Sequence, residues 1–214
     1  MKNYLDLNDF KEIIVLINSI IDENKEYLSQ LDSVIGDGDH GITISSGFKD
    51  TIEKMKEKQF ESISELLIFV GNNFMATVGG TTGPIFGYLF LEMGRTQESN
   101  KEKINLNDLF IMFSQSLNKI MKIGGAKPGE KTMVDTLNSA VNSLNDSVKN
   151  NDNLEIALKK MNEAAKKGLE STKNMVATKG RARYLGERSI GYQDAGATST
   201  YFILSAFSKI LEKN

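Results

Sequence analysis

Cysteine and tryptophan are absent from the 214-residue chain, and histidine occurs only once, at His40. Without cysteine, the chain has no disulfide, no thiolate nucleophile and no cysteine-based zinc site. A single histidine likewise excludes a histidine-rich metal centre. Any metal site in this protein must therefore be built mainly from oxygen ligands, which magnesium and calcium prefer.

An excess of one charge and long apolar runs are also missing. Lysine and arginine number 26 against 28 aspartates and glutamates, a formal net charge of −2. Without a long basic run, neither nucleic acid nor an anionic membrane is expected as the main partner. No apolar stretch approaches the length of a membrane span, and the N-terminus lacks the apolar region of a signal peptide. We therefore expect a cytoplasmic protein.

Proline is scarce, and both examples, Pro84 and Pro128, lie in glycine-rich joints. Between the joints, apolar residues recur every three to four positions, which predicts amphipathic helices, and no alternating strand of five or more residues occurs. The pattern predicts an all-α bundle of about eight helices, with residues 1–214 forming one domain. The expected helical stripes lie within residues 10–21, 42–57, 66–74, 84–94, 109–121, 131–148, 154–174 and 201–211.

The first joint, residues 31–41, places Asp32, Asp37 and Asp39 within eight residues. Carboxylates this close repel one another unless a cation lies between them, which favours a magnesium or calcium site. On composition alone, a polar turn between two helices explains the segment equally well. An EF-hand is excluded, because the twelfth position counted from Asp37 is Phe48 rather than glutamate. Residues 40–43 are expected to form the first turn of the next helix, with free N–H groups facing an anion, and the His40 side chain either contacts phosphate or is structural.

The second and third joints are also rich in glycine. Residues 78–84 fit either an anion-binding helix start or a tight turn capped by Thr81 or Thr82, and taken alone the turn is favoured. Residues 124–132 nearly match a P-loop, but Glu130 separates Gly129 from Lys131 and the preceding segment has helical periodicity. We therefore reject a Walker A motif.

The fourth joint, residues 179–199, is a long segment without strong periodicity, which is typical of functional loops. Its arginines would either neutralise phosphate or form structural ion pairs with Glu187 or Asp194. These arginines are Arg181, Arg183 and Arg188. Its larger apolar side chains are expected to pack rather than to leave the loop disordered: Tyr184, Leu185, Ile190 and Tyr192.

Alternate connections of an up-and-down bundle gather at the same end. If the four joints gather in this way, carboxylates, helix N-termini, hydroxyls and arginine converge on one polyphosphate. The residues themselves therefore predict a metal-dependent nucleotide or phosphate site at one end of the bundle.

Residues 35–41, 79–84, 127–133 and 180–191 resemble the motifs of the nucleotide-binding L subunits of dihydroxyacetone kinases, in the same order and spacing. The same fold forms the C-terminal domain of ATP-dependent dihydroxyacetone kinases. The resemblance covers nearly the whole chain and implies a closed barrel of eight antiparallel helices with the nucleotide at one end. Asp32, Asp37 and Asp39 match the aspartates that hold a pair of Mg²⁺ ions in that family.

The resemblance also implies nucleotide contacts. The matching positions are His40, Gly41, Ile42, Thr43, Thr81, Thr82, Gly124, Met133, Arg181, Asp194, Ala195 and Gly196. The family more often has Ala-Ser in place of the two threonines, and Asp-Pro-Gly in place of residues 194–196. Both departures keep the hydroxyl and the carboxylate that the contacts need.

The chain has room for a nucleotide domain only, so it looks like the separate subunit of the phosphoenolpyruvate-dependent enzyme. In that family, bound ADP receives a phosphoryl group from a phosphohistidine of the M subunit and passes it, as ATP, to dihydroxyacetone on the K subunit. No side-chain nucleophile is expected, and Arg181 would stabilise charge during transfer. The alternatives are the nucleotide subunit of an ATP-dependent dihydroxyacetone or fatty acid kinase, and a regulatory binding subunit. A homodimer is left open.

Overall fold

The computed structural model describes residues 2–96 and 101–212, and within them the chain is all-α apart from one isolated β-bridge between Leu5 and Ile104. Residues 1, 97–100 and 213–214 of the predicted domain lie outside the described part. None of the described helices is long and apolar enough to cross a membrane. The α-helices are α1 (Leu7–Glu23), α2 (Lys25–Ile35), α3 (His40–Lys56), α4 (Ile63–Thr77), α5 (Thr82–Arg95), α6 (Leu106–Gly124), α7 (Met133–Lys149), α8 (Leu154–Ser171) and α9 (Ala195–Glu212), and the 3₁₀ segments are η1 (Thr172–Asn174) and η2 (Arg181–Ser189).

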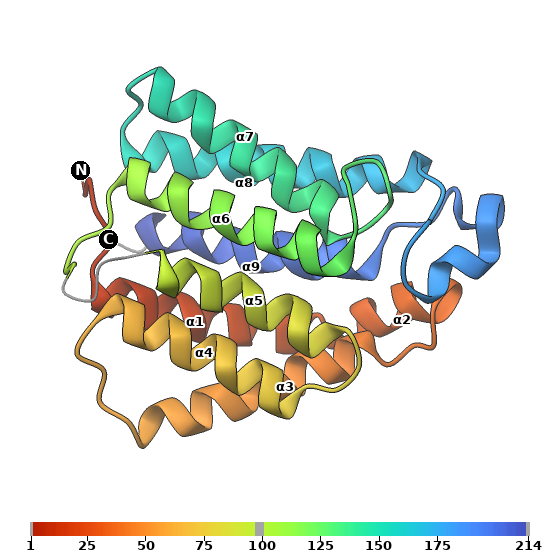
Figure 1. Cartoon of the computed structure of the whole chain (residues 1–214), viewed down its shortest axis with the longest axis horizontal. Helices are drawn as coiled ribbons and strands as arrows, with labels where there is room; N and C mark the ends of the chain where they lie inside the picture. Colours follow the sequence, from red (N-terminus) through yellow and green to blue (C-terminus); the bar gives the residue numbers. More distant parts are fainter. Residues whose placement is uncertain (1, 97–100, 213–214) are drawn as a thin grey trace.

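Eight of these helices form a closed ring in which each packs against its neighbours. The ring runs from α1 to α3 and then in chain order to α9, which packs back against α1 (Figure 1). The predicted all-α class is therefore confirmed. Helix α2 is additional to the predicted stripes and packs beside α3 and α9 near one end of the ring. Leu28 is the single buried residue among its described side chains, so its sequence carries no broad apolar face.

Aromatic side chains from helices far apart in sequence meet inside the ring. Phe207 of α9 lies edge-on to Phe10 of α1 and to Phe113 of α6, with ring centroids 6.1 and 5.2 Å apart. On the other side, Phe48 of α3 packs against Phe74 of α4 at 4.7 Å. The Phe113–Phe207 contact joins helices across the ring and the other two join neighbouring helices, and together they account for the apolar stripes of the sequence.

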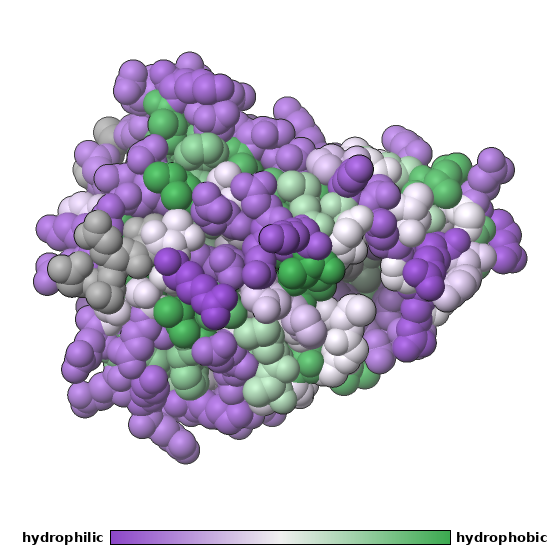
Figure 2. All heavy atoms as spheres, in the orientation of Figure 1, coloured by the Kyte–Doolittle hydropathy of each residue, from purple (hydrophilic) through white to green (hydrophobic). Residues whose placement is uncertain are grey.

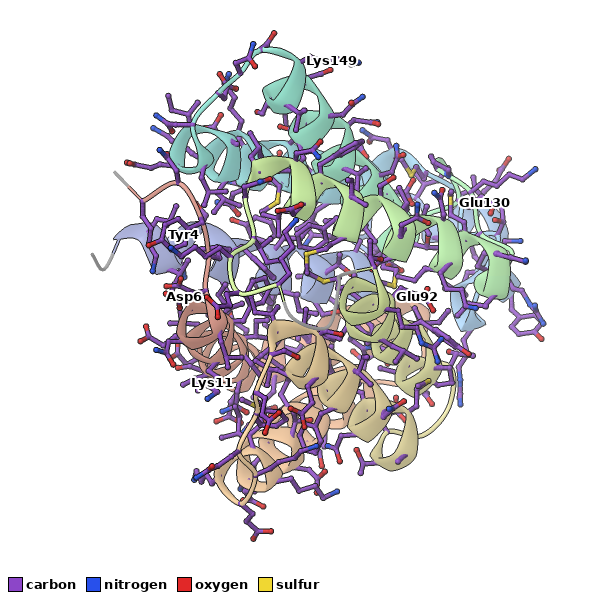
Figure 3. All side chains as sticks on the ribbon, turned by 60° about the vertical axis from the view of Figure 1, so that its left-hand side comes forward. Tyr4, Asp6, Lys11, Glu92, Glu130 and Lys149 are labelled. Carbon is purple, nitrogen blue, oxygen red and sulfur yellow. The ribbon has the colours of Figure 1, made fainter. Side chains whose placement is uncertain are left out.

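The four glycine-rich joints lie at one end of the ring, on the right of Figure 1, and the N-terminus lies at the opposite end. In the turned view of Figure 3, Glu130 of the α6–α7 loop is likewise far from Tyr4 and Asp6. Figure 2 shows mostly hydrophilic residues on the visible face, with hydrophobic ones in small separate patches. The end that carries the joints is therefore the candidate location of a functional site.

Candidate functional site

One cavity of about 1080 Å³ opens at this end of the ring, and residues from all four joints line it. The expectation that the joints gather is therefore met. Most of the expected site residues line this cavity: Asp32, Asp37, Asp39, His40, Thr43, Thr81, Thr82, Gly124, Met133, Arg181, Asp194, Ala195 and Gly196.

Two of the expected residues do not line the cavity. Gly41 is buried against α2, where a Cβ atom would come within 1.9 Å of the Lys25 carbonyl oxygen. The Ile42 side chain is 61% exposed on the outside of α3. Both belong to the first turn of α3, so the helix start reaches the cavity through His40 and Thr43 instead.

The three aspartates are held together by the turn between α2 and α3. The Asp32 Oδ2 atom accepts hydrogen bonds from the backbone N–H groups of Gly38 (2.9 Å) and His40 (3.3 Å). At Gly36, a Cβ atom would stand 2.0 Å from Asp32 Oδ1, and Gly38 has φ +80°. Glycine at position 36 therefore makes room for the chain's own carboxylate, and at position 38 it permits the left-handed turn.

The aspartate cluster fits a hard cation. Asp32, Asp37 and Asp39 each offer an oxygen atom, and these atoms lie within 4.8 Å of one another. Carboxylates this close disfavour one another's charge, and a divalent ion with oxygen ligands relieves that repulsion. The geometry thus favours the metal interpretation of the first joint over a simple polar turn.

Arg181, at the start of η2, reaches the aspartate cluster in the same cavity. Its Nη1 atom lies 2.7 Å from Asp37 Oδ2, and its side chain is 70% exposed. The sequence offered phosphate or an ion pair with Glu187 or Asp194 as alternatives for the arginines of this joint. The ion pair that Arg181 makes is with Asp37, 144 positions away in sequence. Arg183 instead donates to the hydroxyl of Tyr184 at 2.7 Å.

The His40 side chain ties α3 to α9. Its Nε2 atom lies 2.9 Å from the Ser199 hydroxyl oxygen. Burial lowers the pKa of His40, and the nearby carboxylates of Asp32 and Asp39 offset part of that effect. The imidazole is therefore neutral at pH 7, and its hydrogen bond supports a structural role for the ring.

At the cavity, neither α3 nor α5 is capped by the side chain of the residue before it, although Asp32 accepts from the His40 N–H of α3. Asp39 precedes α3 and Thr81 precedes α5, and neither side chain accepts a capping hydrogen bond. The simple capped turn that the sequence favoured for the second joint is therefore not observed at Thr81. A Cβ atom at Gly79 or Gly80 would meet nothing within 4 Å. These glycines leave open space beside the N–H groups at the start of α5, which suits an anion.

The fourth joint contains helical structure that its lack of periodicity did not predict, because η2 occupies Arg181–Ser189 with a kink at Gly186, and α9 begins at Ala195. Leu185 packs on a small cluster formed by Ala177 and Ala182. The other apolar residues expected to pack here are largely exposed, with Tyr184 at 74%, Ile190 at 46% and Tyr192 at 47%.

Asp194 shapes the start of α9. Its Oδ2 atom accepts a hydrogen bond from the Ala197 N–H at 2.7 Å. Burial raises the pKa of Asp194 to about 6, although the Ala197 N–H and Lys131 act in the opposite direction. The Lys131 side chain also turns inward and is 2% exposed, which nothing in its sequence context indicates.

Comparison with known proteins decides the family. A model of the DAK2 domain matches residues 34–209. The chain belongs to the DAK2 domain family. Within this family it is similar to the ADP-binding subunits DhaL of two dihydroxyacetone kinases. The PEP-dependent one of Escherichia coli K12 is 38% identical over 86% of this chain and 88% of that subunit, and the PTS-dependent one of Lactococcus lactis is 37% identical over 91% and 92%. The resemblance seen in the motifs is thereby confirmed.

Larger DAK2 proteins match over only part of their length. The chain is 32% identical to a probable dihydroxyacetone kinase of Dictyostelium discoideum and covers 33% of it. It superposes on the crystal structure of the dihydroxyacetone kinase of C. freundii, in complex with AMP-PNP and Mg²⁺, with a TM-score of 0.72 and 22% identity. That match covers 98% of this chain and 35% of the kinase. The structural likeness supports the all-α fold.

Proposed function

We propose that this chain is the ADP-binding L subunit of a phosphoenolpyruvate-dependent dihydroxyacetone kinase, with residues 1–214 forming one nucleotide-binding domain. The observation that carries the proposal is the cavity in which an aspartate triad, the starts of α3 and α5, and Arg181 meet. The near full-length match to the DhaL subunits of E. coli and L. lactis supports it further, since only about a third of the longer kinases is matched.

ADP and two Mg²⁺ ions are the proposed occupants of the cavity. Asp32, Asp37 and Asp39 would hold the metal ions against the diphosphate, as hard oxygen ligands do. The N–H groups at the starts of α3 and α5 would face the phosphate oxygens. The remaining walls would enclose the nucleoside, and they include Thr43, Thr82, Gly124, Met133, Ala195 and Gly196.

When bound, the nucleotide would carry the phosphoryl group, accepted by ADP from a phosphohistidine of an M subunit and given by ATP to dihydroxyacetone on a K subunit. The chain itself would supply position and charge rather than a nucleophile. Arg181, whose Nη1 atom lies 2.7 Å from Asp37, would offset negative charge at the metal end of the cavity. The neutral His40 and its hydrogen bond to Ser199 would hold the start of α3 against α9.

The first test is mass spectrometry of the small molecules released when the purified protein is denatured, with metal analysis of the same sample. Co-purified ADP and magnesium are expected, as is transfer to dihydroxyacetone when K and M subunits are supplied. An empty protein that uses free ATP with a sugar-binding partner would instead identify an ATP-dependent kinase subunit. A protein that binds a partner but transfers no phosphoryl group would identify a regulator. The cytoplasmic location stays a prediction.

A further inference from the structure

Lys131 has an unusual environment, and the proposed chemistry gives this residue no role. It lies in the loop before α7, with φ +60°, a left-handed conformation that few non-glycine residues adopt. Its side chain is 2% exposed, although lysine is rarely buried without partners. A left-handed backbone conformation persists only where the surrounding structure holds it. The contacts of the buried Lys131 side chain therefore need an explanation.

The Lys131 side chain binds both ends of the segment that carries Arg181. Its Nζ atom donates to the carbonyl oxygen of Thr172 at 2.5 Å and also to that of Tyr192. We call residues 172–194 the strap, because this segment leaves α8, carries Arg181 over the cavity and returns to the start of α9. Lys131 therefore joins the start of α7 to the two points between which the strap spans.

Further hydrogen bonds close the base of the strap at the same place. The Gly191 N–H donates to the Lys173 carbonyl at 2.7 Å, and the Asp194 N–H donates to the Thr172 hydroxyl at 3.2 Å. On the other side of Lys131, Asp135 accepts hydrogen bonds from the N–H groups of Gly129 (2.5 Å) and Thr132 (2.7 Å). The loop that presents Lys131 is thus itself fixed to α7.

Electrostatics agree with this geometry. Burial lowers the pKa of Lys131, whereas the nearby carboxylates of Asp194 and Asp135 raise it. The positive end of the side chain therefore faces two acidic groups as well as two carbonyl oxygens. Removing this amine would leave the two carboxylates without a nearby cation and the two carbonyl oxygens without a donor, all inside the protein.

We propose that Lys131 is a positioning residue that fastens the strap to the start of α7 and so sets Arg181 and Asp194 at their places in the nucleotide cavity. The effect of Lys131 on nucleotide binding rests on the proposed function, but its hydrogen bonds to the strap form without a ligand. A direct contact between Lys131 and phosphate is the competing explanation. The two carbonyl partners argue against it, because they turn Nζ into the protein.

The test replaces Lys131 by methionine, which keeps the length of the side chain and removes its donors. Lys127→Met is the matched control, since Lys127 belongs to the same loop and is exposed. Hydrogen exchange is measured on nucleotide-free protein, and affinity for ADP with Mg²⁺ by calorimetry. For Lys131→Met we expect faster exchange at the amides of Gly191 and Asp194 and about tenfold or greater loss of affinity, as when a group that orients ligands is removed. In Lys127→Met, the exchange rates and the affinity for ADP should stay at parental values.

The absence of cysteine permits a rescue experiment. Lys131→Cys would carry the single thiol of the chain, which can be alkylated in denaturant and the protein then refolded. Bromoethylamine restores an amine at nearly the length of lysine, and bromopropane adds a neutral group of the same size. The aminoethylated protein is expected to regain the parental exchange pattern and most of the affinity, and the propylated protein is not.

Three results would overturn the proposal. Unchanged strap exchange with reduced affinity would indicate a direct phosphate contact, and equal behaviour of the two alkylated proteins would show that the amine is unimportant. Loss of helical circular dichroism in Lys131→Met would assign Lys131 to general stability instead. If the parent protein fails to bind ADP with Mg²⁺, the proposed function fails, whereas the exchange comparison still tests the strap.

Discussion

At the end of the barrel that holds the N-terminus, all four helices begin with a cap from the side chain of the preceding residue. At the cavity end, α3 and α5 lack such a cap, although Asp32 accepts from the His40 N–H of α3. The capped starts belong to α1, α4, α6 and α8, and their caps are Asp6, Ser62, Asn105 and Asn153. At the cavity end, the side chains of Thr132 and Asp194 accept such bonds from the N–H groups at the starts of α7 and α9. Helix starts that lack a cap from the preceding residue thus lie where the cavity opens.

Charges follow the same division. Near the N-terminus, Lys2 pairs with Asp9 and Lys101 with Asp108, each at 2.6 Å, beside the Leu5–Ile104 bridge. At the cavity end, the aspartate cluster has one ion pair among the described residues, that of Arg181 with Asp37. One end satisfies its own polar groups and contributes stability, and the other keeps polar groups available for a ligand at some cost in stability.

The largest effect is expected from Asp37→Asn at the cavity end. The change removes a proposed metal ligand and the partner of Arg181, so phosphoryl transfer should fall by about a hundredfold to a thousandfold, as when a group that stabilises charge is lost. Circular dichroism should not change, because Asp37 is exposed. Asp146→Asn, at an exposed position of α7, is the control. Parental activity with normal metal affinity in Asp37→Asn would remove the aspartate from the site.

Asp194→Asn tests whether the cavity end costs stability. Because its folded pKa is about 6 instead of 3.8, the folded protein holds this proton more strongly than the unfolded chain does. The free energy of unfolding therefore falls as pH rises from about 4 to about 6, by at most about 3 kcal/mol. Asparagine removes this loss and can still accept from Ala197.

Without metal or nucleotide, Asp194→Asn and the parent should have the same thermal unfolding temperature below pH 4. At pH 7.5 the variant should unfold at a higher temperature than the parent. Its affinity for ADP should nevertheless decrease. An equal difference between the two proteins at both pH values would show that Asp194 does not titrate as described.

Asp6→Ala probes the opposite end. Asp6 accepts from the N–H groups of Asn8 and Asp9 at 2.9 and 3.1 Å. Losing this cap should cost about 1–2 kcal/mol of stability in urea unfolding, and ADP affinity should not change. Asp6→Asn keeps an acceptor and serves as the control. A loss of ADP affinity in Asp6→Ala at temperatures well below unfolding would contradict the separation of the two ends.

Thr81→Ala should give the smallest effect and the reverse pattern. Thr81 makes no capping hydrogen bond, so stability should change by less than about 0.5 kcal/mol. If its hydroxyl contacts the nucleotide, ADP affinity should fall by about three- to tenfold, the value of one hydrogen bond. Calorimetry and urea unfolding measure the two quantities, and Thr81→Ser should behave as the parent. A stability loss as large as that of Asp6→Ala would show that Thr81 is a cap after all.

Much of the fold followed from local patterns. Apolar spacing located the eight helices of the ring. Helix α2 was not predicted, because a helix with one buried described side chain has no broad apolar stripe. The aspartate cluster was visible because its members are neighbours in sequence, so their repulsion and its relief by a cation follow from spacing alone.

The sequence by itself determined the all-α class, the four joints and the chemistry that each joint offers, because periodicity, glycine and charge act over short distances along the chain. Only the tertiary structure decided which groups meet. The pairing of Arg181 with Asp37, of His40 with Ser199 and of Lys131 with the strap carbonyls joins residues 41 to 159 positions apart. Such contacts depend on the closure of the ring and on which side chains burial turns inward, and no local pattern records either.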